Sequence, residues 1–227
     1  MKSNIICIYP EDETTNFLLP IYECLNNLPN FVGYRNNTTS PDNTRQIVDA
    51  LTKADLSSIV VFLGHGASSK LYGSIYPNGT KHVLLDDSHI ELFSNFNTIC
   101  VSCRSAEYLK ESSGTYIGFG DITSDFSEVI ATRQFEDADY LNWASEEDIH
   151  MFRTLLVEAL VKAINYTKCS NISSIFRITE LYINKTITQL LLDKKIPNYR
   201  HIANMFYNLL EDMVCVLNDK HVYGSVQ

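Results

Sequence analysis

The sequence predicts an α/β protein with a mostly parallel sheet sandwiched by helices. Two short apolar runs, Ile59–Leu63 and Ile99–Val101, lack the alternation of a half-exposed strand, so we expect strands that are buried on both faces. Segments of helical periodicity separate the apolar runs along the chain. Such alternation of strand and helix is typical of a parallel sheet with helical crossovers.

Residues 1–125 supply this α/β pattern in order, as the α/β core of the predicted fold. We expect strands at 5–9, 31–34, 59–63, 98–103 and 115–119, and helices at 13–26, 43–54, 87–93 and 104–110. Residues 66–84 show neither pattern and are expected to form an irregular loop at the carboxyl end of a strand. Loops in that position often shape a pocket.

From about residue 126 the sequence changes to long helical patterns. Ser145 and Asp148 form a capping box at the start of one helix, a second spans about 174–192, and Asn198 begins a third whose apolar positions continue to Leu217. Residues 221–224 predict a closing strand. We find no repeat or linker, so we expect a single domain over residues 1–227, in which the mainly helical residues 126–227 pack on the sheet.

The composition argues against several classes of partner. The net charge is −9, from 18 basic and 27 acidic residues without a basic cluster, so no nucleic-acid partner is expected. No apolar run reaches the ~20 residues of a membrane span, and the first residues lack the apolar region and cleavage site of a secretory signal. We therefore expect a cytoplasmic protein that does not bind a membrane.

In the cytoplasm the six cysteines are expected to be reduced. Five of them lie in apolar contexts and predict core packing: Cys7, Cys24, Cys100, Cys169 and Cys215. No second C-x-x-C pair and no histidine pair completes a metal site, so neither a metal nor another cofactor is expected.

Two chemically capable side chains end the two apolar runs. His65 follows the first run between Gly64 and Gly66, and Cys103 follows the second. If the two strands are neighbours, their carboxyl ends bring an imidazole and a thiol to one cleft. The imidazole can deprotonate the thiol for attack on a carbonyl, and the N-terminus of the following helix favours the thiolate. The backbone N–H groups of Gly66 and Cys103 could form an oxyanion hole.

Four segments carry a resemblance to a known family. Val60–Ser69 with Leu71–Gly73, then Ile99–Ala106, Tyr116–Asp125 and Val222–Gly224, are similar in order to the histidine block, the cysteine block, the next strand with its loop, and the closing strand of caspase-like cysteine peptidases. The CHAT type of peptidase is the most similar. The resemblance implies an endopeptidase with His65 as general base and then acid, and Cys103 as the nucleophile that forms a thioester.

The same resemblance implies a substrate and a setting. In separase-like members an acidic residue after the next strand binds a basic side chain on the amino side of the cleaved bond. Asp121 stands at the matching place with Asp125 nearby, which implies a preference for Arg or Lys; the alternative is that Asp121 only caps a turn. The chain carries no fused sensor domain, so a separate activator is expected. By analogy, the peptidase cuts and thereby activates a partner protein in bacterial antiviral defence or cell death.

Three other interpretations stay open. The first is a catalytically silent caspase-like interaction module. The second is an α/β-hydrolase esterase or thioesterase, but the sequence has no nucleophile elbow and its histidine precedes the candidate nucleophile. The third is a thiol-redox protein that uses Cys100 and Cys103, for which a Cys100→Ser substitution would abolish activity.

Overall fold

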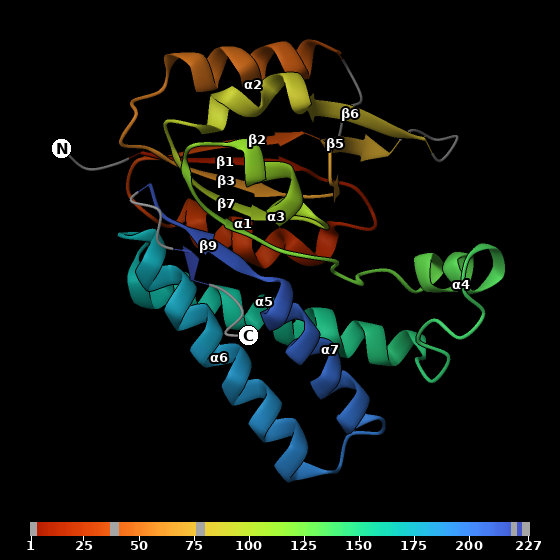
Figure 1. Cartoon of the computed structure of the whole chain (residues 1–227). Helices are drawn as coiled ribbons and strands as arrows, with labels where there is room; N and C mark the ends of the chain where they lie inside the picture. Colours follow the sequence, from red (N-terminus) through yellow and green to blue (C-terminus); the bar gives the residue numbers. More distant parts are fainter. Residues whose placement is uncertain (1–3, 37–40, 76–79, 219–221, 224–227) are drawn as a thin grey trace.

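The computed structural model describes residues 4–36, 41–75, 80–218 and 222–223, and confirms the predicted α/β class with a mainly parallel sheet (Figure 1). Seven strands form this sheet in the order β10-β9-β8-β7-β3-β1-β2. The strands are β1 (Ile5–Pro10), β2 (Phe31–Asn36), β3 (Ile59–Leu63), β7 (Asn97–Val101), β8 (Thr115–Gly118), β9 (Val214–Val216) and β10 (Val222–Tyr223). The pairs from β2 to β8 are parallel, whereas β9 and β10 are each antiparallel to their neighbours.

Helices cover both faces of the sheet, which explains the unbroken apolar runs. Alternate strand residues face two separate clusters: Cys7, Val61 and Val101 belong to one, and Val60 and Cys100 to the other. The first cluster packs against α1 (Leu19–Asn26), α5 (Glu146–Thr167) and α6 (Ile172–Asp193). The second packs against α2 (Pro41–Lys53) and the 3-10 helix η2 (Asp87–Phe93). In Figure 1, α2 lies above the sheet, and α5 and α6 lie below it.

The C-terminal half contributes four helices, three of which begin with a recognisable cap. The capping box predicted for α5 is present: Ser145 Oγ accepts from the Asp148 N–H at 3.3 Å, and Asp148 Oδ2 accepts from the Ser145 N–H at 2.9 Å. Asn171 caps α6, and Asp125 caps α4 (Phe126–Phe135). Asn198 precedes α7 (Tyr199–Asp212) as predicted, but its side chain instead donates to Asp148 Oδ2 at 2.9 Å and ties the starts of α7 and α5 together.

The prediction of an irregular loop over 66–84 is wrong. β4 (Gly66–Ala67), β5 (Lys70–Ile75) and β6 (Lys81–Asp86) form a small antiparallel sheet, whereas residues 76–79 lie outside the described residues. Leu71 and Leu85 from this sheet are buried. The register between β5 and β6 shifts on both sides of Tyr72, and these irregularities interrupt the period of two that would have marked the strands in the sequence.

Helical extent was also overestimated at three places. The helix expected over 13–26 begins as α1 only at Leu19, after a turn at 13–15 and a 3-10 turn at Asn16–Leu18. α7 ends at Asp212, and Val214–Val216 form strand β9 against β8, so the apolar spacing to Leu217 did not mark a continuous helix. β-Branched valines favour this strand once β8 offers an unpaired edge. After Cys103 the chain makes only a four-residue helix, α3 (Ser105–Tyr108), and a 3-10 turn. The closing strand is present as β10, with His221 and Gly224 outside the described part.

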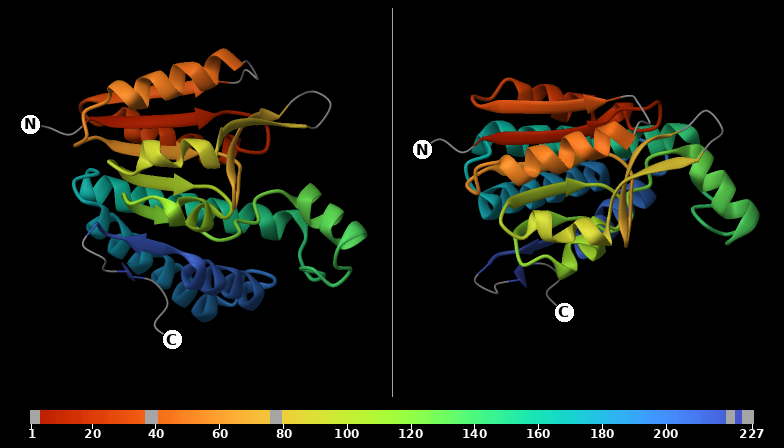
Figure 2. Two further views of the ribbon diagram at one scale, coloured as in Figure 1. Left: turned by 45° about the horizontal axis from the view of Figure 1, so that its top comes forward. Right: turned by 90° about the horizontal axis from the view of Figure 1, so that it is seen from above.

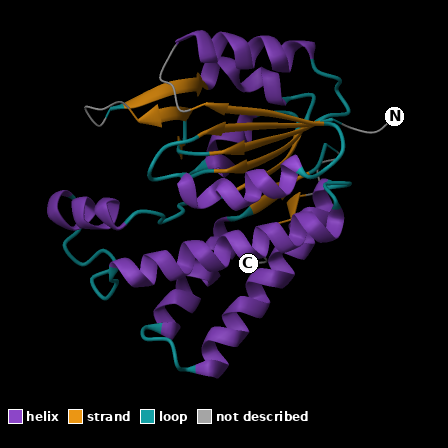
Figure 3. Cartoon of the chain, turned by 180° about the vertical axis from the view of Figure 1, so that it is seen from behind, coloured by secondary structure: helices purple, strands orange, loops and turns teal. Residues whose placement is uncertain are grey.

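The parallel strands β1, β3, β7 and β8 all end on the same side of the sheet, which we call the carboxyl edge. The hairpin of β5 and β6 and helix α4 both project beyond this edge in the two turned views (Figure 2). The view from behind shows the same arrangement, with the arrowheads of the strands pointing toward that hairpin and α4 (Figure 3).

Close packing of β8 on α3 gives a test of the fold. A Cβ added at Gly118 would lie 2.6 Å from the Ala106 Cα and 2.7 Å from its backbone N, and neither atom can rotate away. We expect Gly118→Ala to lower the free energy of unfolding by about 1–3 kcal/mol in urea denaturation. Gly73→Ala is the control, because its nearest neighbour is the His82 side chain at 3.0 Å. Equal losses for both variants would contradict the described packing.

Candidate active site

The strands that precede His65 and Cys103 are neighbours, which is the condition on which the expected cleft depends. β3 and β7 pair in parallel with Leu63 opposite Val101, and the Gly64 N–H continues the pairing by donating to the Val101 carbonyl at 3.2 Å. A Cβ added at Gly66 would lie 2.6 Å from the Cys103 carbonyl oxygen. The backbone segments that follow β3 and β7 therefore touch just beyond the strands, and only glycine fits at position 66. The backbone thus delivers both residues to the carboxyl edge.

The Cys103 thiol turns toward the segment that follows β8. Its Sγ donates to the Ile122 carbonyl at 3.3 Å and accepts from the Ile122 N–H at 3.4 Å. Burial raises the pKa of the thiol to about 11, and the carboxylates of Glu128 and Asp121 act in the same direction. The expected lowering by a helix N-terminus is not found, because α3 has only four residues and begins two positions after Cys103, beyond Arg104 in a left-handed conformation with φ 53°.

A cavity of about 580 Å³ opens beside Cys103. Its charged lining consists of Arg104, Asp121, Glu128 and Glu136, and the other lining residues are Ile122, Thr123, Val129, Ala131, Thr132, Phe135 and Tyr140. Three carboxylates against one guanidinium make the cavity acidic.

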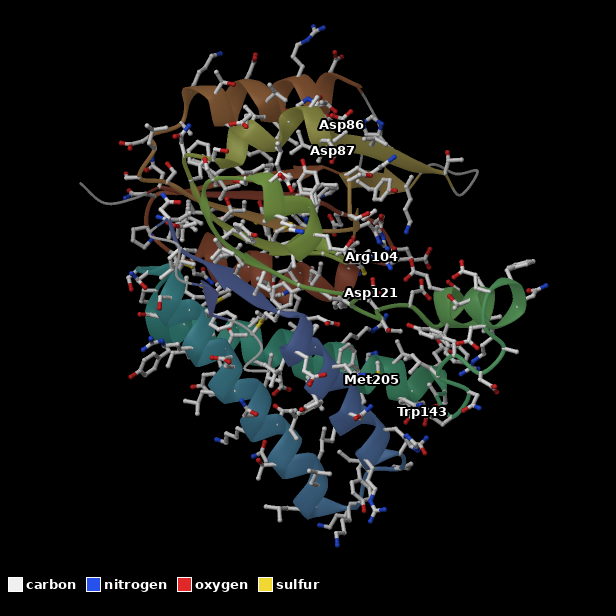
Figure 4. The ribbon with its side chains drawn as sticks, viewed as in Figure 1. Asp86, Asp87, Arg104, Asp121, Trp143 and Met205 are labelled. Carbon is white, nitrogen blue, oxygen red and sulfur yellow. The ribbon has the colours of Figure 1, made fainter. Side chains whose placement is uncertain are left out.

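Asp121 and Asp125, the predicted substrate-binding residues, occupy different places. Asp121 lines the cavity, where its Oδ1 lies 3.2 Å from Arg104 Nε (Figure 4). Asp125 is not part of that lining; its Oδ1 accepts from the Ser127 N–H at 2.8 Å and caps α4. A substrate in the cavity could therefore reach Asp121, whereas Asp125 lies outside the cavity lining.

His65 is buried and turns toward the segment that follows β1. Its Nε2 lies 2.6 Å from Thr14 Oγ1 and 3.5 Å from Asp12 Oδ2. Among the described residues, no hydrogen bond joins the His65 ring to the Cys103 thiol, so the two side chains share an edge but have different partners. Sequence reasoning missed Asp12 and Thr14. The available signal was their place just after Pro10, at the end of the strand that pairs with β3.

The two predicted oxyanion-hole groups lie in different local structures. Gly66 belongs to β4 and stands opposite Leu71 in the small sheet. The Cys103 N–H makes no hydrogen bond to any other residue in the part of the chain that the structure describes. A carbonyl oxygen placed near Cys103 would therefore find at least one donor that the fold does not already use.

The thiol-redox interpretation gains no support from the geometry. Cys100 is fully buried and packs with Val60 and Phe62, whereas Cys103 packs against the cluster on the opposite face. Burial also raises the pKa of Cys100 to about 12. All six cysteines are free thiols, and no group of three or more metal-ligating side chains occurs within residues 4–36, 41–75, 80–218 and 222–223.

Fold and site together define an α/β protein with a mainly parallel sheet and a histidine and a cysteine at the ends of its two central strands. Neither the known protein families nor the curated proteins include a match to this chain. Within the described segments, no helix has the length and apolar character needed to cross a membrane.

The raised pKa of Cys103 makes a measurable prediction for the free protein. A thiol with a pKa of about 11 has roughly 300-fold less thiolate at neutral pH than an ordinary cysteine of pKa about 8.5. We expect slow alkylation of Cys103 by iodoacetamide at pH 7.5, with a rate that rises toward a midpoint near 11. Peptide mapping by mass spectrometry measures the rate, and glutathione is the reference thiol. A midpoint at or below 8.5 would contradict the described burial.

Proposed function

We propose that this protein is a cysteine endopeptidase with a caspase-like fold, of the CHAT type. The observation that carries the proposal is the pairing of β3 with β7, which sets His65 and Cys103 at adjacent strand ends, with an open cavity beside Cys103. The order of sequence blocks that resembles this family supports it. The lack of a nucleophile elbow and the chain order of histidine before cysteine argue against an α/β-hydrolase.

In the proposed reaction, His65 takes the proton of the Cys103 thiol, and the thiolate attacks the carbonyl carbon of the peptide. The Cys103 N–H, with that of Gly66 as the expected second donor, stabilises the oxyanion. The C–N bond then breaks, His65 gives its proton to the leaving amine, and a thioester remains. Water attacks this thioester with His65 again as base, which releases the carboxylic acid and restores the thiol. Substrate has to replace the bond between Sγ and Ile122.

The acidic cavity supports a preference for Lys or Arg before the cleaved bond. Arg104 already pairs with Asp121, and Lys81 lies 3.3 Å from the Glu128 carboxylate. Glu136 has no ion pair with another described residue, so its carboxylate is the most available to a substrate cation. We therefore propose Glu136, together with Asp121, as the acidic groups of the binding cavity.

The wider setting of the proposal comes only from the family resemblance. It consists of a cytoplasmic peptidase that a separate protein activates, and that in turn activates a partner by cutting it in a bacterial defence or cell-death response. A catalytically silent interaction module is the second candidate. It is favoured by the raised pKa of the half-buried Cys103 thiol and by its two hydrogen bonds to Ile122.

Cleavage of a diverse peptide library separates the two candidates. We expect the wild-type protein to cut peptides and Cys103→Ala to lose all cleavage, because no other nucleophile replaces the thiol; mass spectrometry maps the cuts. Cys100→Ser is the matched control and should lose little activity, since its thiol lies on the other face of the sheet. Two results would refute the peptidase proposal. One is cleavage that survives in Cys103→Ala, and the other is a wild-type protein that cuts no peptide even when its activating protein is present.

Substitution of the cavity carboxylates tests the substrate preference. We expect Glu136→Gln to lower kcat/KM for peptides with Lys or Arg before the cut by about tenfold, because one charge-assisted contact is lost, and to spare peptides with neutral residues there. Asp121→Asn should act in the same direction. Glu146→Gln, an exposed position at the start of α5, is the control. An unchanged ratio of basic to neutral substrates in both cavity variants would exclude these roles.

A further inference from the structure

We propose that Asp12 and Thr14 are positioning residues that hold the His65 imidazole in one tautomer, with the proton on Nε2 and the lone pair on Nδ1. The catalytic consequence of this arrangement rests on the proposed function, but the tautomer itself does not. The structural basis is a hydrogen-bonded chain from the turn after β1 to the imidazole at the end of β3.

The turn after β1 is held rigidly by its own hydrogen bonds. Asp12 Oδ1 accepts from the backbone N–H of Thr14 at 3.0 Å and from that of Thr15 at 2.9 Å. Thr15 is buried, its Oγ1 donates to the Pro10 carbonyl at 3.3 Å, and its own carbonyl accepts from the Tyr9 hydroxyl at 3.2 Å. The Asp12 carboxylate and the Thr14 hydroxyl therefore keep a fixed place beside β3.

Proton counting along the chain assigns the tautomer. The Thr14 hydroxyl has one proton, which it donates to Asp12 Oδ1 at 2.8 Å. At the 2.6 Å contact with His65 Nε2, the same oxygen must then accept, so Nε2 is the ring nitrogen that carries hydrogen. In a neutral imidazole the other nitrogen is an acceptor, which leaves Nδ1 as the only ring atom able to take a proton.

The second carboxylate oxygen faces the ring as well. Asp12 Oδ2 is buried, makes no hydrogen bond within the described residues, and lies 3.5 Å from His65 Nε2. Burial would raise the pKa of this carboxyl, but the nearby His65 ring and the hydrogen bonds from Thr14 and Thr15 outweigh it and hold the pKa well below its ordinary value. An ionised carboxylate in this place stabilises the imidazolium that forms when Nδ1 takes a proton. Positioning of a histidine by a carboxylate is a general device of nucleophilic catalysis.

Nitrogen NMR of the labelled full-length protein tests the tautomer without any substrate. His65→Gln identifies the ring signals, and we expect one neutral tautomer in the wild type, protonated at Nε2. Thr14→Val keeps the side-chain shape but removes the hydroxyl, and should produce a mixture of the two tautomers. Thr14→Ser restores the hydroxyl and the wild-type pattern. Protonation of wild-type His65 at Nδ1, or a Thr14→Val spectrum identical to the wild type, would overturn the proposal.

Kinetics then separate positioning from mere structural support. If the protein cleaves peptides, Thr14→Val should lower kcat by about ten- to a hundredfold with little change in KM, whereas Thr14→Ser stays near wild type. Urea unfolding confirms that each variant is folded. Failure of the peptidase proposal is distinguishable, because peptides would go uncut while the Nε2 tautomer persists. If only the positioning proposal fails, peptide cleavage still depends on Cys103, but the neutral His65 ring is protonated at Nδ1 instead of Nε2.

Discussion

The parallel pairing of β3 with β7 is the interaction on which the candidate active site depends. A shift of one residue along either strand would turn every side chain of that strand to the other face. Both faces are buried, with Val61 and Val101 in one cluster and Val60 and Cys100 in the other, so this register is strongly held. The same register sets Leu63 opposite Val101 and therefore fixes where the chain emerges at the carboxyl edge.

The site consists of two halves, each supported by the next strand outward. β1 lies beside β3 and supplies the turn that binds His65, and β8 lies beside β7 and supplies Ile122, which binds Cys103. The segment after β8 is itself held at several points: Asp121 pairs with Arg104, and the Ser124 carbonyl accepts from Arg153 at 3.2 Å. These contacts hold the segment that hydrogen-bonds the half-buried thiol beside the cavity.

Much of the fold could be predicted, because burial on two faces leaves a local trace. The buried strands β1, β3, β7 and β8 and the start of α5 follow from apolar runs and a capping box, whereas the edge strand β2 is partly exposed. β5 and β6 were missed because shifts in their register break the alternation, and β9 was missed because Met213 and Leu217 mimic helical spacing. Val214–Val216 form a strand rather than a helix because they pair with the edge of β8, which lies nearly a hundred residues earlier in the chain.

The sequence by itself determined the α/β class and the two strand ends that carry His65 and Cys103, since both follow from hydrophobic periodicity within a few residues. Only the tertiary structure decided the partners of these side chains. Thr14 is 51 residues from His65, and Ile122 is 19 residues from Cys103. Hydrogen bonds between such distant residues leave no periodic pattern in the sequence, because they form only after strand order has brought the loops together.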